Sequence, residues 1–210
     1  MRNAPRVLCQ PVLSKARHLV KAQIAKADWE RLRSADERVW LFSPDAGGRQ
    51  SKAVRKYILH GEKVCNLEAY KLKHRDPWYC VKDVREGMGF LSGMTKFGPW
   101  ICFRTMRYLA VTNTLYVLTA KIKMNADERA AWALSLLSSP CRQQFKRLAR
   151  RYPDGLPKLE PRDLYAFRLQ SPNQTAGAPP KYKQAIAFLL DGNEAKAVAI
   201  ADAFIGAKCT

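Results

Sequence analysis

The sequence has few acidic residues and no long apolar run. It contains 18 Asp and Glu residues against 37 Lys and Arg residues, which gives a formal net charge of +19. No apolar run approaches the roughly 20 residues that a membrane-spanning helix requires. Neither a basic amphipathic helix nor a lipidation signal is visible. We therefore expect no membrane partner.

Cysteine and histidine are also too few and too scattered for a metal centre. The chain has six cysteines and three histidines, and no two cysteines form a Cys-x-x-Cys pair. The spacing therefore predicts no zinc site. Since no signal peptide is visible, we expect free thiols in a reducing cytoplasm.

The motifs of several enzyme classes are missing. Gly87-Met88-Gly89 is a lone Gly-x-Gly without a preceding apolar strand, so a turn is favoured over a nucleotide loop. Ser92 lies in Gly89–Gly93, which lacks the Gly-x-Ser-x-Gly order of a nucleophile elbow. No Gly-x-x-x-x-Gly-Lys loop is present. Asp154, Glu160 and Asp163 lie among Gly and Pro residues without a paired Glu-x-Lys, which argues against a metal nuclease.

What the sequence has in excess is positive charge, and the charge is unevenly placed. Residues 171–210 contain four of the 37 basic residues and three of the 18 acidic residues, so the basic character belongs to residues 1–170. A polyanion is the commonest explanation of such an excess, and nucleic acid is the leading candidate. The alternative is a generally basic protein without a specific partner. At 47% hydrophobic residues, the chain can bury a core and is expected to fold.

The patterns predict an α+β fold: a small, mostly antiparallel sheet with flanking helices, plus a C-terminal helical hairpin. Residues 1–75 are expected to be mostly helical, with a short helix over 28–32, a strand over 39–42 and a helix that Ser51 caps and Gly61 ends. The strands of the sheet are expected in β-branched or aromatic runs: Trp78–Val81, Phe90–Leu91, Trp100–Phe103 and Leu115–Ile122.

Two helices are expected to follow in residues 126–170. Asn125 can cap the first, with Asp127 and Glu128 in its first turn. Ser139 and Pro140 start the second, which is expected to point Phe145, Leu148, Ala149 and Tyr152 inward. Its other face would then present a ridge of Arg142, Lys146 and Arg150, with Arg147 and Arg151 beside it. A solvated face is the alternative to phosphate contact for this ridge.

The chain is expected to divide into a domain over 1–170, a linker over 171–180 and a helical hairpin over 181–210. The hairpin is too small to fold alone, so it is expected to pack on the main body or on a partner.

Several segments, taken in order, resemble a known family. They are Pro11–Leu19, Arg75–Tyr79, Ser92–Leu115, Leu136–Ser139 and Leu156–Pro161. Together they are similar to the TaqI-like C-terminal specificity region, the target-recognition domain, of DNA adenine methyltransferases of restriction-modification type. The resemblance covers about residues 10–170, and Met1–Gln10 stand where the first strands of that region would begin.

The resemblance implies a noncatalytic unit that binds duplex DNA and selects a short sequence. The family's catalytic domain precedes this region and has no counterpart in this chain. Ser138-Ser139-Pro140-Cys141 lacks the Asn and the aromatic ring of the Asn-Pro-Pro-Tyr motif. We therefore expect no cofactor and no methylation by this chain alone, with S-adenosylmethionine bound by a catalytic partner. A cytoplasmic, nucleoid-associated protein is expected.

DNA contacts are expected from cations and amides. Arg104 and Arg107 are the preferred base readers, because Arg can donate two hydrogen bonds to guanine. Trp78 and Tyr79 are favoured as core residues over base-stacking residues. A surface cation is the alternative for each Lys and Arg. The full set of expected DNA-binding residues is Lys15, Arg17, His18, Lys21, Lys71, Lys73, Arg75, Lys96, Arg104, Arg107, Asn113, Lys146, Arg150 and Lys158.

Two other functions stay open. The chain could be a subunit of a split methyltransferase or restriction-modification complex, active only with a partner. In that case Ile186, Leu189, Ile200 and Phe204 of the hairpin would form the docking surface. The weaker alternative is a general RNA- or DNA-binding basic protein.

Overall fold

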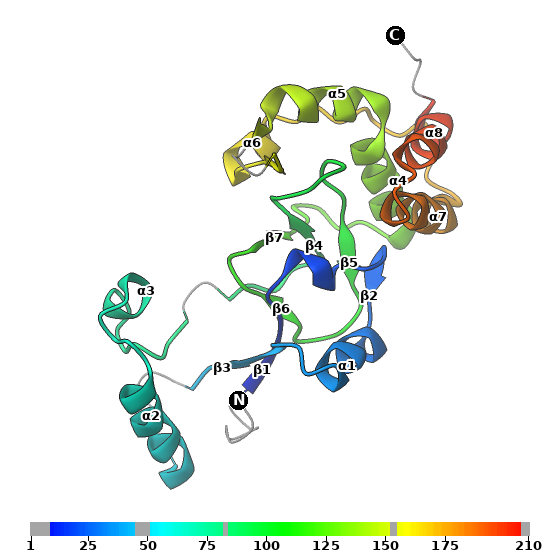
Figure 1. Cartoon of the computed structure of the whole chain (residues 1–210). Coiled ribbons are helices and arrows are strands. Elements are labelled where there is room, and N and C mark those ends of the chain that lie inside the picture. Colours follow the sequence, from blue (N-terminus) through cyan, green and yellow to red (C-terminus); the bar gives the residue numbers. More distant parts are fainter. Residues whose placement is uncertain (1–8, 45–50, 82–83, 152–154, 207–210) are drawn as a thin grey trace.

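Two small sheets form the centre of the molecule (Figure 1). The computed structural model describes residues 9–44, 51–81, 84–151 and 155–206. One sheet has the order β2-β5-β4-β7 and the other has the order β3-β1-β6, while β8 and β9 form a separate ribbon. The strands are β1 (Cys9–Leu13), β2 (Gln23–Ile24), β3 (Trp40–Phe42), β4 (Gly89–Ser92), β5 (Cys102–Arg104), β6 (Ala110–Val111), β7 (Leu115–Leu118), β8 (Arg150–Arg151) and β9 (Pro157–Lys158).

The predicted α+β class and the mostly antiparallel pairing are confirmed. Among the described strands, β1 with β3, β4 with β5, β4 with β7 and β8 with β9 are antiparallel. Strand β1 pairs with β6 and strand β2 with β5 in parallel. Within residues 9–75, helices cover more of the described chain than strands do, as expected, and the strand expected over 39–42 is present as β3. Strands β1 and β2 from the same stretch were not expected. Strands of two to five residues are too short to show a period of two in the sequence.

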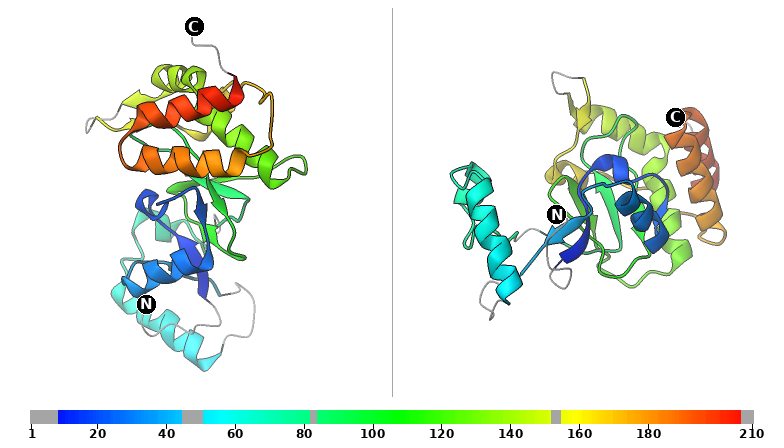
Figure 2. Two further views of the ribbon diagram at one scale, coloured as in Figure 1. Left: turned by 90° about the vertical axis from the view of Figure 1, so that its right-hand side faces the viewer. Right: turned by 60° about the horizontal axis from the view of Figure 1, so that its bottom comes forward.

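Helix α1 lies on one side of the sheets and α4, α7 and α8 lie on another, while α2 and α3 lie apart from the sheets (Figures 1 and 2). Ser51 Oγ accepts a hydrogen bond from Val54 N–H, and Asn125 Oδ1 accepts one from Glu128 N–H, so both predicted caps are confirmed. The helices are the 3-10 helix η2 (Ala16–His18), α1 (Lys26–Ser34), α2 (Lys52–Val64), α3 (Tyr70–Lys73), α4 (Ala126–Leu137), α5 (Ser139–Leu148), α6 (Pro161–Tyr165), α7 (Ala178–Leu190) and α8 (Glu194–Ile205).

Gly61 does not end its helix, which continues to Val64. A Cβ atom on Gly61 would lie 2.5 Å from the Trp78 ring. The glycine therefore lets the indole pack against α2, and the predicted end of the helix at Gly61 is wrong. The predicted strand over Trp78–Val81 is also wrong: these residues form a turn and an irregular segment.

The turn predicted at Gly87-Met88-Gly89 is wrong for Gly89, which is the first residue of strand β4. A Cβ atom on Gly89 would lie 2.8 Å from Ile101 Cγ2 and 3.1 Å from Cys102 O. A Cβ atom on Gly87 would lie 2.4 Å from Val117 Cγ1. Both glycines therefore allow the neighbouring strands to approach closely.

Two predicted elements end earlier than expected. Strand β7 ends at Leu118, short of Ile122. Helix α5 ends at Leu148, because Ala149 takes the extended backbone angles φ −71° and ψ 131°. Arg150 and Arg151 therefore belong to strand β8, and the predicted helical ridge that includes them is wrong. Tyr152, which was expected to point inward, lies outside the described residues.

The C-terminal helix pair is packed on the main body. Helix α7 begins at Ala178, inside the expected linker, and α7 and α8 contact each other and α4. Tyr182 is fully buried, and its hydroxyl bonds to the backbone of Ile101, the residue before strand β5. The hairpin was expected to pack either here or on a partner, and the main body is the surface it uses.

The packing of this pair excludes the docking surface expected for a split enzyme. Ile186 and Leu189 are fully buried and Phe204 is 8% exposed, all in one core cluster with Leu134 and Ile101. Ile200 packs against the same cluster. These side chains pack in the core of this chain, so the prediction that they form a docking surface for a partner is wrong.

A second core cluster lies between the two sheets and α1. It contains Leu13, Trp29, Phe90 and Leu109, among others. No helix in the described part of the chain is long and apolar enough to cross a membrane. The same residues contain no group of three or more His, Cys, Asp or Glu side chains placed to hold a metal ion.

Candidate DNA interface

Three segments that are distant in sequence meet at the end of the sheet marked by Ser92. Ser92 pairs with Leu115, so the chain after β4 and the chain before β7 lie at the same end. Thr112 N–H donates a 3.1 Å hydrogen bond to Leu13 O, and Thr114 Oγ1 donates a 2.6 Å hydrogen bond to Ser14 O. The turn that contains Asn113 is thereby fixed beside the segment that contains Lys15 and Arg17. Asn113 itself is exposed.

The ribbon β8–β9 joins the same end of the sheet. Met94 forms an antiparallel bridge with Lys158, and Thr95 N–H donates a 3.2 Å hydrogen bond to Pro157 O. Lys158 in turn pairs with Arg150. Lys96, Lys158 and Arg150 are therefore neighbours, although they come from three regions of the chain.

Lys146 approaches this group from the last turn of α5, which leads directly into β8. A cation is favourable there, because the carbonyl end of a helix carries a partial negative charge. Arg147 shares this turn, and Lys146, Arg147, Arg150 and Arg151 are all exposed. The end of α5 and the ribbon together present a dense group of cations.

Glu37 organises the cations of the N-terminal segment. Its carboxylate lies 3.1 Å from Lys15 Nζ and accepts a 2.6 Å hydrogen bond from Arg17, and His18 Nε2 lies 3.4 Å away. The hydrogen bonds from Arg17 and Lys15 lower the pKa of Glu37 from its ordinary value to about 2. The carboxylate stays charged and holds both cations next to each other. No local pattern in the sequence pointed to Glu37.

His18 has a structural environment. Its side chain is 1% exposed, and Nδ1 faces Ser14 N–H at 3.4 Å. Because Nδ1 accepts a hydrogen bond there, the proton lies on Nε2, which faces Glu37. Burial lowers the pKa of His18 despite this carboxylate. The imidazole therefore connects the Ser14 backbone to Glu37 from inside the fold.

A shallow depression of about 430 Å³ links these groups. Arg17 and Val20 line one side of it, and Ser92, Met94 and Thr95 line the other. The N-terminal segment and the 93–98 loop therefore share one continuous surface, which we call the basic face. Seven of the expected DNA-binding residues belong to it: Lys15, Arg17, Lys96, Asn113, Lys146, Arg150 and Lys158.

The preferred base readers lie elsewhere. Strands β4 and β5 are antiparallel, so Arg104, the last residue of β5, and Arg107 after it lie at the end opposite to Ser92. Arg104 donates to Gly87 O at 2.7 Å and Met106 O at 3.2 Å, and lies 3.1 Å from Glu86. Its guanidinium therefore forms hydrogen bonds to the backbone before β4 and to the backbone after β5. Arg107 is exposed.

The other expected residues are also apart from the basic face. Lys21 Nζ lies 2.6 Å from Asp28, the carboxylate at the start of α1. Lys71 and Lys73 are on α3, and Arg75 follows it. Lys73 Nζ lies 2.9 Å from Glu68. The expected set is therefore not one surface: Lys21 lies beside α1, whereas Lys71, Lys73 and Arg75 belong to an arm.

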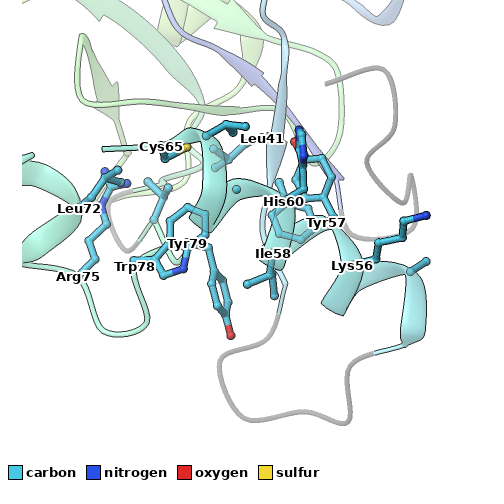
Figure 3. Close-up of a pocket in the computed structure, with 15 residues that line it drawn as sticks. Leu41, Lys56, Tyr57, Ile58, His60, Cys65, Leu72, Arg75, Trp78 and Tyr79 are labelled. Atoms are coloured by element: carbon cyan, nitrogen blue, oxygen red, sulfur yellow. The ribbon is translucent and has the colours of Figure 1, made fainter. Parts of the chain in front are cut away.

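That arm, built from α2 and α3, contains a cavity of about 730 Å³ (Figure 3). The Trp78 and Tyr79 rings meet edge to face with centroids 5.7 Å apart. Both pack against the buried cluster of Phe42, Val54 and Ile58. Trp78 and Tyr79, which were favoured as core residues over base-stacking residues, are partly buried against the core of the arm and do not belong to the core of the sheet.

Arg142 was expected on an outer ridge, and this prediction is wrong. It is 6% exposed, and its guanidinium donates to Phe97 O. Its Nε also lies 3.6 Å from Glu194. Burial lowers the pKa of Arg142. A helical period places Arg142 in line with Lys146, and only the fold of the 93–98 loop over α5 reveals that it is covered.

Comparison with known proteins identifies the family of this chain. A model of the C-terminal domain of the type II methyltransferase M.Eco57I matches residues 3–205. The chain belongs to this family. This methyltransferase C-terminal domain is also 24% identical over 154 residues to the type II methyltransferase M.AccI of Acinetobacter calcoaceticus. The match covers 73% of the chain and 28% of the relative, so the chain spans about a quarter of that enzyme. No solved structure matches.

Proposed function

We propose that this methyltransferase C-terminal domain binds duplex DNA and recognises the target sequence for a catalytic part that performs the methylation. The basic face is the observation that supports this most strongly. It gathers cations from four segments, and phosphate contacts from such a surface would fix the position and orientation of the duplex. The net charge of +19 supplies the long-range attraction.

Methyl transfer belongs, in this proposal, to the catalytic part. S-adenosylmethionine needs a Gly-rich loop with open backbone, whereas the space beside Gly87 and Gly89 is filled by Val117, Ile101 and Cys102. These residues do not fit the cofactor, and we derive no chemical step in this chain. We propose adenine as the methylated base on the family resemblance alone.

A binding selection tests this function. The purified chain is offered randomised duplex DNA at about 150 mM salt, at which weak phosphate contacts are screened. An enriched motif of a few base pairs is expected. Arg107→Ala and Arg104→Ala then test the two arginines as base readers. A change in the motif without loss of folding would support a role in reading. Equal binding to RNA and to unrelated DNA would instead support a general nucleic-acid-binding protein.

The second candidate function is that of a subunit that acts only with a catalytic partner. A groove of about 830 Å³ beside the edge strand β7 favours it. Ile122 and Tyr165 line this groove and are 71% and 83% exposed. Exposed apolar side chains around a groove are typical of protein interfaces. Methylation that appears only when the chain is mixed with an S-adenosylmethionine-binding subunit, and that Ile122→Glu abolishes, would support this function.

A further inference from the structure

The depression in the basic face is lined mostly by apolar side chains, with Arg17 as the cation among its lining residues. Val20 is 53% exposed and Met94 is 39% exposed, and both line the depression. Arg17 lies on its rim, and Lys158 is bridged to Met94. A solvated phosphate-binding surface has no need of exposed apolar side chains at its centre. Their position suggests contact with a less polar part of the DNA.

The loop that presents Met94 is held from several sides. Ser92 Oγ donates to Met94 O at 2.6 Å and accepts from Met94 N–H at 3.2 Å. Thr95 Oγ1 donates to Gly98 O at 2.9 Å, and Gly98 has a φ of 83° that favours glycine. These bonds fix the backbone at both ends of the loop. A side chain on such a backbone is presented in a defined place.

Two further contacts fix this loop to the body of the protein. The buried Arg142 guanidinium donates a hydrogen bond to Phe97 O in this loop. The Tyr116 ring fills the space beside Gly93, where a Cβ atom would lie 2.5 Å from the Tyr116 hydroxyl oxygen. Tyr116 also donates a 2.8 Å hydrogen bond to Leu159 O next to β9. The buried arginine is therefore a positioning residue for the loop.

The chemistry of DNA supplies one partner for such a surface. In the major groove the base edges are donors and acceptors, except for the 5-methyl group of thymine. Phosphates flank the groove on both sides, and cations on the two sides of an apolar centre match this order. An apolar side chain against the thymine methyl group is an established form of base reading.

We propose that Met94, with Val20 beside it, reads a thymine of the target by contact with its 5-methyl group, while Arg17, Lys96 and Lys158 contact the flanking phosphates. The inference rests on the proposed function. It assigns base reading to the Ser92–Gly98 loop, at the end of the sheet opposite to Arg104 and Arg107.

The test replaces thymines by deoxyuridine, which lacks the methyl group. The duplex enriched in the binding selection is synthesised with one thymine replaced at a time, and the Kd of the full chain is measured for each. At one position the wild type is expected to lose about fourfold in affinity, the value for one buried methyl group. Met94→Ala is expected to bind the thymine and deoxyuridine duplexes equally, whereas Met94→Leu retains discrimination.

A matched control is Leu59→Ala, which truncates an exposed side chain on α2, away from the basic face. It should discriminate thymine from deoxyuridine as the wild type does. If wild type and Met94→Ala respond equally to every replacement, the inference is overturned and the proposed function stands. If the wild type enriches no motif, both fail.

Discussion

The hydroxyl of Tyr182 bonds to both backbone groups of Ile101: it accepts a hydrogen bond from the N–H at 2.9 Å and donates one to the C=O at 2.5 Å. Tyr182 is on α7 and Ile101 immediately precedes β5. Together with the shared core cluster, this pair fastens the C-terminal helices to the sheet. Residues 178–205 are therefore part of the same folded unit.

Tyr182→Phe is expected to lower the free energy of unfolding by about 1–3 kcal/mol, because it leaves two buried backbone groups without partners. Urea unfolding followed by circular dichroism measures the change. Tyr165→Phe is the matched control, since Tyr165 is 83% exposed, and it should unfold like the wild type. Equal stability of Tyr182→Phe and wild type would show that the two hydrogen bonds between Tyr182 and Ile101 contribute nothing to stability.

Glu37→Gln is expected to strengthen DNA binding several-fold, because Lys15 and Arg17 would no longer be neutralised by a carboxylate and could both contact phosphate. The salt dependence of the affinity should become steeper at the same time. The control is Glu30→Gln on α1, whose carboxylate lies 3.8 Å from Lys26 and away from the basic face. Unchanged affinity in Glu37→Gln would place Lys15 and Arg17 outside the contact surface.

The same group predicts how stability depends on pH. The folded pKa of Glu37, about 2, lies below its ordinary value of 4.5, so its contribution is present above pH 4.5 and is lost as the pH falls toward 2. His18 acts in the same direction: its folded pKa lies below 6.5, so stability declines as the pH falls below that value. Urea unfolding from pH 7.5 to 3 should therefore show falling stability. In Glu37→Gln the decline below pH 4.5 should be shallower; an identical decline would contradict this role.

Arg150→Ala is expected to weaken binding to all DNA sequences alike and to reduce the slope of log affinity against log salt by about 1, the signature of one lost phosphate contact. Titrations at several salt concentrations with the enriched and a shuffled duplex measure both effects. Lys183→Ala, an exposed cation on α7 outside the basic face, should leave the slope unchanged. A loss restricted to the enriched duplex would mean that Arg150 reads a base and not the backbone.

The elements with strong local signals could be predicted from the sequence. The Asn125 cap and the Ser51 cap are both confirmed. The short strands β1 and β2 could not be predicted, because their pairings with β6 and β5 join residues about 80 to 100 positions apart. Local propensity says little about strands of this kind.

The candidate site shows the same division. The excess positive charge and the family resemblance indicated that cations would contact DNA, but they did not indicate which cations share a surface. Glu37 is 19 to 22 positions from the three side chains that it holds, so no sequence pattern links them. Arg142 fits the period of a charged ridge, yet the 93–98 loop covers it. In both cases the tertiary fold decides the role of the charge.

The most direct test of the central claim is the ratio of two dissociation constants, for the selected duplex and for a shuffled duplex of the same composition, at about 150 mM salt. If the chain recognises a DNA sequence by itself, the selected duplex should bind on the order of a thousandfold more tightly, and both affinities should fall steeply as salt rises. Equal constants for the two duplexes, matched by a structured RNA of the same length, would contradict sequence recognition by this chain.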